Sequence, residues 1–89
     1  MMFKDFILNN ELGLHARPAA QIATLAAEAA SDVWMISGGE QVNAKSIIDI
    51  LSLYGPKGSQ IRFVIDNPQD IGTLNAIAAL IENGFGENT

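Results

Sequence analysis

Two hydrophobic periods alternate along this chain of 89 residues, and together they leave few folds open. A helical period predicts helices from Ala16 to Ala30, from Ser46 to Leu53, and from Pro68 to just before Gly84. Short runs rich in aromatic and β-branched residues predict strands over residues 3–8, 33–37, 40–43 and 60–66. The resulting order, βαββαβα, indicates an α+β two-layer sandwich with the helices on one face of an antiparallel sheet. This reasoning leaves the order of the strands open.

Glycine, proline and asparagine mark the boundaries between these elements. Gly38-Gly39 is typical of a tight hairpin, because both turn positions need a positive φ that glycine tolerates. Asn67-Pro68 is typical of a helix start, with a capping side chain followed by proline in the first position. Gly84 is the expected helix stop, and we expect the tail from Gly86 to Thr89 to be frayed.

Length and composition exclude several classes of function. The length fits one domain spanning residues 1–89. The absence of cysteine rules out disulfides, and a single histidine leaves too few ligands for a structural zinc site. The net charge of −5 argues against nucleic acid and anionic membranes as partners. With no long apolar run and no signal-peptide pattern at the start, we expect a soluble cytoplasmic protein.

The segment 13–20 places the single histidine at a predicted helix start. Pro18 falls in the first turn, so His15 lies at or beside the N-cap. A helix N-terminus offers unpaired N–H groups and a positive dipole end, and both favour a bound anion such as phosphate. Arg17 adds a guanidinium suited to phosphate. The positive end also disfavours a protonated imidazole, which favours the nucleophilic ring needed for phosphoryl transfer.

The string Gly13-Leu14-His15-Ala16-Arg17-Pro18-Ala19 resembles the active-site signature of HPr, the histidine phosphocarrier family of the phosphoenolpyruvate-dependent sugar phosphotransferase system (PTS). A second block, residues 42–48, resembles the regulatory-serine segment of that family, at a matching distance from the histidine. Gly58, the strand from Ile61 and the helix around residues 74–76 extend the resemblance over nearly the whole chain.

The resemblance implies a fold and a role. The fold is an open-faced sandwich, with a four-stranded antiparallel sheet in the order 1-4-2-3 and three helices on one face. The role is that of a covalent carrier rather than a stand-alone enzyme. His15 would accept a phosphoryl group on Nδ1 from enzyme I and give it to an enzyme IIA domain, and Arg17 would stabilise the phosphohistidine. No cofactor and no metal are expected.

Ser46 has two interpretations. It stands before an apolar helical run and fits a capping position with Asp49 three residues on, so one interpretation is a structural cap. The resemblance implies the other, phosphorylation by an ATP-dependent HPr serine kinase that regulates transfer at the histidine. A phosphoserine at a helix start is electrostatically favoured, so the two interpretations are compatible.

A partner-binding surface is expected around the histidine. Its predicted members are Leu14, Ala16, Ala20, Lys45, Ile47, Ile48 and Leu51. Ile48 is the best candidate for an exposed apolar side chain, while Leu51 could equally belong to the core. Arg17 and Lys45 would rim this surface, and a monomer that docks weakly by one face is expected. Many family members carry more lysines here, so steering toward acidic partners should be weaker.

Two alternatives to the phosphocarrier stay open. One is a regulatory interaction module of a PTS-like phosphorelay, acting through Ser46 and the Ile48 surface, although the intact run from His15 to Pro18 argues against it. The other is a small enzyme with a histidine nucleophile that acts on a free phosphate ester. So small a sandwich is not expected to hold the deep pocket that this second alternative needs.

Overall fold

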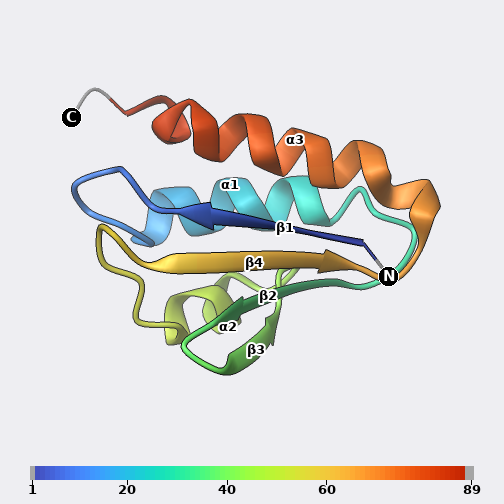
Figure 1. Ribbon diagram of the computed structural model, residues 1–89, viewed down its shortest axis with the longest axis horizontal. Coiled ribbons are helices and arrows are strands. Elements are labelled where there is room, and N and C mark those ends of the chain that lie inside the picture. The colour runs from blue at the N-terminus through green and yellow to red at the C-terminus, as the bar shows by residue number, and fades with distance from the viewer. Residues whose placement is uncertain (1, 88–89) are drawn as a thin grey trace.

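The computed structural model describes residues 2–87 and has the element order expected from the sequence (Figure 1). The strands are β1 (Met2–Ile7), β2 (Val33–Ser37), β3 (Glu40–Asn43) and β4 (Gln60–Ile65). The helices are α1 (Ala16–Ala26), α2 (Ile47–Ser52) and α3 (Ile71–Glu82), with single 3-10 turns η1 (Pro68–Asp70) and η2 (Gly84–Gly86) at the two ends of α3. No helix in the described part of the chain is long and apolar enough to cross a membrane.

The four strands form one antiparallel sheet in the order β1-β4-β2-β3, which confirms the order implied by the resemblance. In register, Lys4 faces Phe63 across β1 and β4, and Met35 faces Phe63 across β2 and β4. The hairpin between β2 and β3 turns at Gly38 and Gly39, with φ of 58° and 82°. Both angles lie where glycine is favoured, so the hairpin prediction is confirmed.

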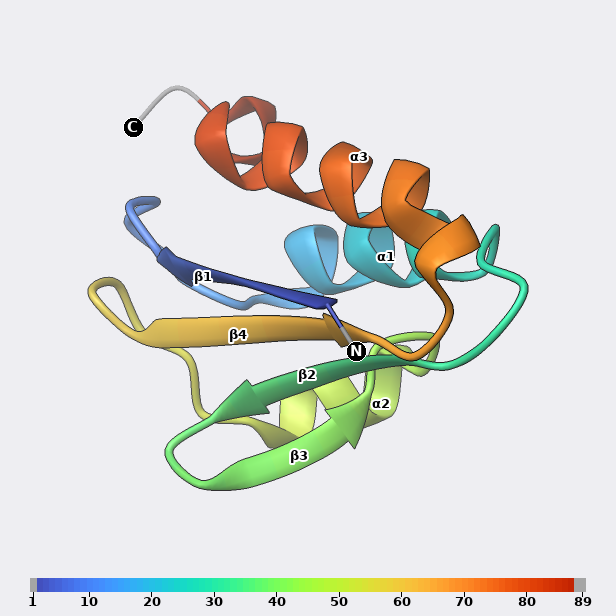
Figure 2. The same ribbon diagram turned by 45° about the vertical axis from the view of Figure 1, so that its right-hand side comes forward.

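The core lies between the sheet and the helices. Alternate residues of the strands point inward, so Met35, Ile61 and Phe63 are fully buried against the apolar stripes of the helices. Those stripes include Ile22 from α1 and Ile77 from α3. Figure 2 shows α1 and α2 behind the sheet and α3 above β1. The opposite face of the sheet carries no helix, so the sandwich is open on that side.

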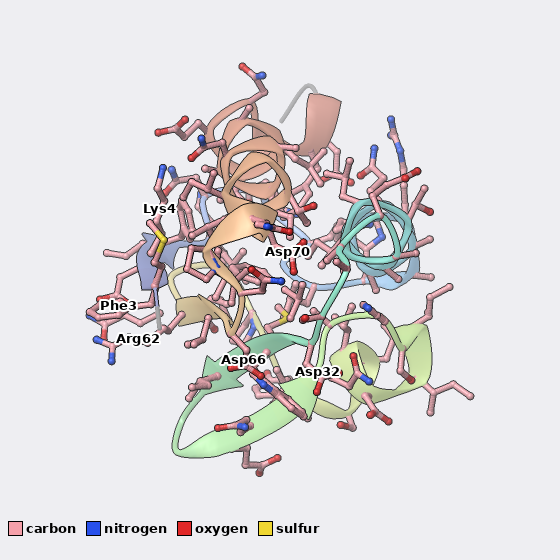
Figure 3. All side chains as sticks on the ribbon, turned by 90° about the vertical axis from the view of Figure 1, so that its right-hand side faces the viewer. Phe3, Lys4, Asp32, Arg62, Asp66 and Asp70 are labelled. Atoms are coloured by element: carbon pink, nitrogen blue, oxygen red, sulfur yellow. The ribbon has the colours of Figure 1, made fainter. Side chains whose placement is uncertain are left out.

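Side chains on the open face cover part of it themselves. Arg62 donates to Asp5 across β1 and β4 at 2.7 Å, and its guanidinium lies 4.0 Å from the centre of the Phe3 ring. Figure 3 shows Phe3 and Arg62 together on the side of the sheet away from the helices. The hydrogen bond from Arg62 lowers the pKa of the Asp5 carboxyl. Val64 is only 6% exposed, between Phe3 and Trp34 in the register.

Helix α1 is shorter than predicted, because it ends at Ala26 and not at Ala30. The cause is a contact from a distant part of the chain. Both oxygens of the buried Asp70 carboxylate accept from the loop after α1, one from the Ala30 N–H at 2.8 Å and one from the Ser31 N–H at 3.0 Å. Figure 3 shows Asp70 between the start of α3 and this loop. These bonds turn residues 30–31 toward α3 in place of a fourth helical turn.

We expect Asp70→Ala to destabilise the protein by about 2–3 kcal/mol, because two partly buried N–H groups lose a charged acceptor. Urea unfolding followed by circular dichroism measures the change. Asp32→Ala, in the same region but exposed, is the matched control and should change stability by less than about 0.5 kcal/mol. Equal stability of the two variants would contradict the role given to Asp70.

Candidate functional site

His15 is the N-cap of α1, as the sequence predicts. Its backbone is extended, and its carbonyl accepts the Ala19 N–H at 3.1 Å. Its side chain makes no capping bond to the helix, so the imidazole can interact with other groups. The N–H groups of Ala16 and Arg17 precede the first intrahelical donor, the Ala19 N–H, and Pro18 has no N–H. The helix start therefore offers two backbone donors beside a ring whose side chain is 32% exposed.

The loop before His15 is fixed by a close backbone contact. Gly13 has a φ of +61°, and a Cβ there would lie 2.0 Å from the Gly55 carbonyl oxygen. That same oxygen accepts the Leu14 N–H at 2.8 Å, which ties the loop to the residues after α2. Leu14 is only 6% exposed and belongs to the core. Its assignment to the partner surface was wrong, because its side chain packs over Gly55.

A carboxylate that the sequence analysis overlooked binds the imidazole. Glu87 Oε2 lies 2.7 Å from His15 Nε2, and Glu87 Oε1 accepts from Asn10 Nδ2 at 3.0 Å. Asn10 is itself buried, and the same Nδ2 donates to the Gly13 carbonyl at 2.8 Å. The Asn10 hydrogen bond lowers the pKa of Glu87, and the hydrogen bond and charge of His15 and the charge of Arg17 lower it further. Glu87 is thus held as an ionised carboxylate with an exposed fraction of 9%.

The prediction of a frayed tail was wrong for Gly86 and Glu87, while Asn88 and Thr89 lie outside the described residues. The reason is Phe85, which is 1% exposed and pulls the chain back onto the core after α3. Phe85 has a φ of +59°, a left-handed conformation that costs a side-chain residue about 1 kcal/mol and is offset here by burial of the ring. An aromatic residue directly after a helix stop was the signal that could have revealed this return.

The return brings the C-terminal segment against the start of α1 and the loop before it. Figure 1 shows the C-terminal end of α3 at the same end of the molecule as the start of α1 and the loop before it.

Because an ionised carboxylate has no hydrogen to donate, the hydrogen in the Glu87–His15 bond belongs to Nε2. In the neutral ring, Nδ1 is then the atom with the free lone pair.

The remaining predicted surface residues fall into two groups. Ile47, Ile48 and Leu51 are 42%, 79% and 43% exposed, and we call these three residues the α2 patch. Ala16 and Arg17 are exposed at the start of α1, Arg17 has no ion pair with residues 2–87, and Ala20 is half-buried one turn further on. Helices α1 and α2 pack against each other. The α2 patch therefore lies on a helix neighbouring the one that His15 begins.

Lys45 and Ser46 lie away from His15. The Lys45 ammonium donates to the Ala29 carbonyl at 3.3 Å, beyond the C-terminal end of α1, whereas His15 stands at its N-terminal end. The Lys45 side chain is thus tied to the opposite end of α1 from His15, and its place at the rim of the partner surface stays a prediction. Ser46 caps α2, where its Oγ accepts the Asp49 N–H at 3.2 Å.

Two hollows on the molecule bear on the alternative of a small enzyme. One of about 450 Å³ lies on the open face of the sheet, and residues of β1, β2 and β4 line it. Another of about 370 Å³ lies between α1 and α3 and includes Ala20. Neither is lined by His15, so neither places a small substrate against the imidazole.

Fold and site together define an open-faced α+β sandwich that presents a histidine at a helix N-terminus. A family model described as the PTS HPr component phosphorylation site matches residues 3–83. This chain belongs to the HPr family of phosphocarrier proteins of the PTS.

Individual relatives agree over almost the whole chain. Phosphocarrier protein HPr from Cupriavidus necator is 40% identical over 87 residues, 98% of each chain. Phosphocarrier protein NPr from Klebsiella oxytoca is 35% identical over 82 residues, 91% of each chain. The crystal structure of HPr-C-His from Thermoanaerobacter tengcongensis superimposes with a TM-score of 0.93 at 34% identity and covers all of both chains.

Proposed function

We propose that this protein accepts a phosphoryl group on Nδ1 of His15 from phosphorylated enzyme I and passes it to an enzyme IIA domain of the PTS. The observation that carries the proposal is the pairing of Nε2 with Glu87, which leaves the lone pair on Nδ1 at an exposed helix start. Family membership supports the kind of chemistry, and this geometry supports Nδ1 as the atom that takes the phosphoryl group.

The helix start supplies the groups that hold the phosphoryl oxygens. The backbone N–H groups of Ala16 and Arg17 can donate to an anion placed beyond Nδ1, and the positive end of α1 favours its charge. The guanidinium of Arg17 is free to approach the same oxygens with two parallel donors. These groups stabilise the phosphoryl group in transit without forming a bond to phosphorus.

We further propose that the partners dock over the start of α1 and the α2 patch. The patch is apolar and Arg17 supplies the nearby positive charge, which suits a small and transient interface with an acidic rim on the partner. Because the chain carries a net charge of −5, long-range steering toward acidic partners should be weak, and short-range contact carries the recognition. We propose a monomer, since one docking face serves both partners in turn.

The test is phosphoryl transfer with purified components. Phosphoenolpyruvate and enzyme I are mixed with this protein, and intact mass is measured before and after addition of an enzyme IIA domain. One acid-labile phosphoryl group that disappears when enzyme IIA is added supports the proposal. The small-enzyme alternative is tested separately, by incubating this protein with a simple phosphate ester in the absence of enzyme I. Turnover of the ester is the positive result for that alternative.

We propose Ser46 as a regulatory phosphorylation site for an HPr serine kinase. Ser46 is half-exposed, and it stands beside the exposed Ile47 and Ile48. Because Ser46 lies toward the far end of α1 from His15, a phosphate there would act on docking at the α2 patch and not on the imidazole itself. The regulatory module is the second candidate function, and this adjacency of Ser46 to the patch is what favours it.

The capping role of Ser46 gives a separate prediction. Ser46→Ala should cost about 1 kcal/mol of stability, because the Asp49 N–H loses its side-chain acceptor. Thermal unfolding measures the loss, and Ser46→Thr is the control that should retain most of the cap. Phosphoryl acceptance at His15 should be unchanged in the absence of a kinase. A Ser46→Ala protein as stable as wild type would show that the cap contributes nothing.

A further inference from the structure

We propose that Glu87 is a positioning residue for phosphoryl transfer, which keeps the proton of His15 on Nε2 and stabilises the positive charge that the ring acquires when it takes the phosphoryl group. The proposal rests on the proposed function of His15. It concerns a residue outside the histidine motif and outside the matched span of residues 3–83.

Glu87 is built into the protein as an acceptor for two donors. One carboxylate oxygen lies 2.7 Å from Nε2 of His15, and the other accepts from Asn10 Nδ2 at 3.0 Å. Asn10 is in turn fixed by its bond to the Gly13 carbonyl and is 2% exposed. The carboxylate is therefore held from behind by a buried amide and is aimed at the imidazole. Burial to 9% exposure shields it from competing water.

The chemistry of the step shows why this carboxylate matters. The lone pair of Nδ1 forms a bond to phosphorus, while the bond from phosphorus to the donor breaks and its electron pair leaves with the donor. Nε2 keeps its hydrogen, so the ring becomes a phosphorylated imidazolium with a positive charge. Glu87, 2.7 Å from that hydrogen, opposes the charge as it develops.

The return step uses the same arrangement in reverse. The electron pair of the P–Nδ1 bond returns to Nδ1 when the acceptor takes the phosphoryl group, and the ring becomes neutral again with its hydrogen still on Nε2. No proton has to enter or leave in either direction. A carrier that exchanges phosphoryl groups between two partners gains from this, because neither partner must supply a general acid or base to the imidazole.

A carboxylate is required because both bonds need an acceptor. In Glu87→Gln, an amide of the same shape, one oxygen remains, and it can satisfy either Asn10 or His15 but not both. If the amide nitrogen faces His15, it donates to Nε2 and moves the ring hydrogen to Nδ1, which blocks the nucleophile. In either arrangement the negative charge is gone.

The experiment combines nuclear magnetic resonance with transfer kinetics. The ¹⁵N shifts of the two ring nitrogens report which one carries the hydrogen, in the free protein and without enzyme I. The rate of phosphoryl acceptance is then measured with enzyme I and phosphoenolpyruvate. Glu87→Gln and Glu87→Ala are compared with Glu82→Gln, which removes the same charge from an exposed position on α3. Circular dichroism establishes that each variant is folded.

We expect a mixture of ring tautomers and roughly tenfold slower acceptance in both Glu87 variants, with Glu82→Gln like wild type. Wild-type ring shifts in the Glu87 variants would overturn the proposal, even if transfer slowed, because the effect would then come from docking. Wild-type rates would overturn it as well. If the wild-type protein itself accepted no phosphoryl group, the proposed function of His15 would fail, whereas the ring shifts would still decide the placement of the proton.

Discussion

We expect the replacement of His15 with alanine to abolish acceptance of the phosphoryl group from phosphorylated enzyme I, with a fall in rate of at least about a thousandfold. The reason is that no other imidazole or thiol exists in the chain, because His15 is the single histidine and there is no cysteine. Intact-mass measurement in the presence of phosphoenolpyruvate and enzyme I checks this result. Wild type should gain one phosphoryl group that is lost in acid, as a bond from phosphorus to nitrogen is.

The matched comparison for His15→Ala is Ser46→Ala, which removes the other candidate phosphorylation site and should still accept one phosphoryl group. His15→Ala should remain folded, since the side chain of His15 makes no capping bond to α1. Acid-labile phosphate on the His15→Ala protein would contradict the assignment of the carrier atom. So would phosphate that survives acid in the wild type, because it would lie on a hydroxyl group.

The second large effect is expected at Gly13, where alanine should destabilise the protein by about 3 kcal/mol. Two costs add there. A φ of +61° is strained for any residue with a Cβ, and that Cβ would meet the Gly55 carbonyl oxygen at 2.0 Å. Relief of the clash moves the loop that holds Asn10, Leu14 and His15. Transfer from enzyme I should therefore slow together with the loss of stability. Urea unfolding and the mass assay measure the two effects.

Gly38→Ala is the control for Gly13→Ala, because its φ of +58° is nearly the same and no atom lies within 4 Å of the added Cβ. It should cost about 1 kcal/mol, the part due to backbone strain alone, and leave transfer unchanged. The difference between the two variants isolates the contact with Gly55. Equal losses would show that the loop yields freely and that this contact does not fix the position of His15.

Local patterns predicted the elements of the fold well where their causes are local. The hairpin at Gly38-Gly39 follows from a requirement of the turn itself, and the cap of α2 by Ser46 follows from a side chain and an N–H three residues apart. His15 at the start of α1 likewise follows from the position of Pro18. In each case the residues that interact are neighbours in the sequence, so the sequence states the interaction directly.

Predictions failed where a distant segment intervened. Helix α1 ends early because Asp70, about forty residues away, binds the N–H groups of Ala30 and Ser31. Leu14 is buried because it packs on Gly55. The exposure of Leu51, which the sequence left open, was decided by which side of a six-residue helix faces the core.

By itself the sequence determined the class of fold, the family and the histidine that carries the proposed chemistry, because periodicity, turn residues and an uninterrupted motif are properties of neighbouring residues. Only the tertiary structure decided which group contacts Nε2 of that histidine. Glu87 and His15 are 72 residues apart in the chain, and only the return of the tail at Phe85 brings the carboxylate to Nε2. A contact of this kind depends on how the buried side chains of distant segments pack together, and no pattern of neighbouring residues predicts that packing.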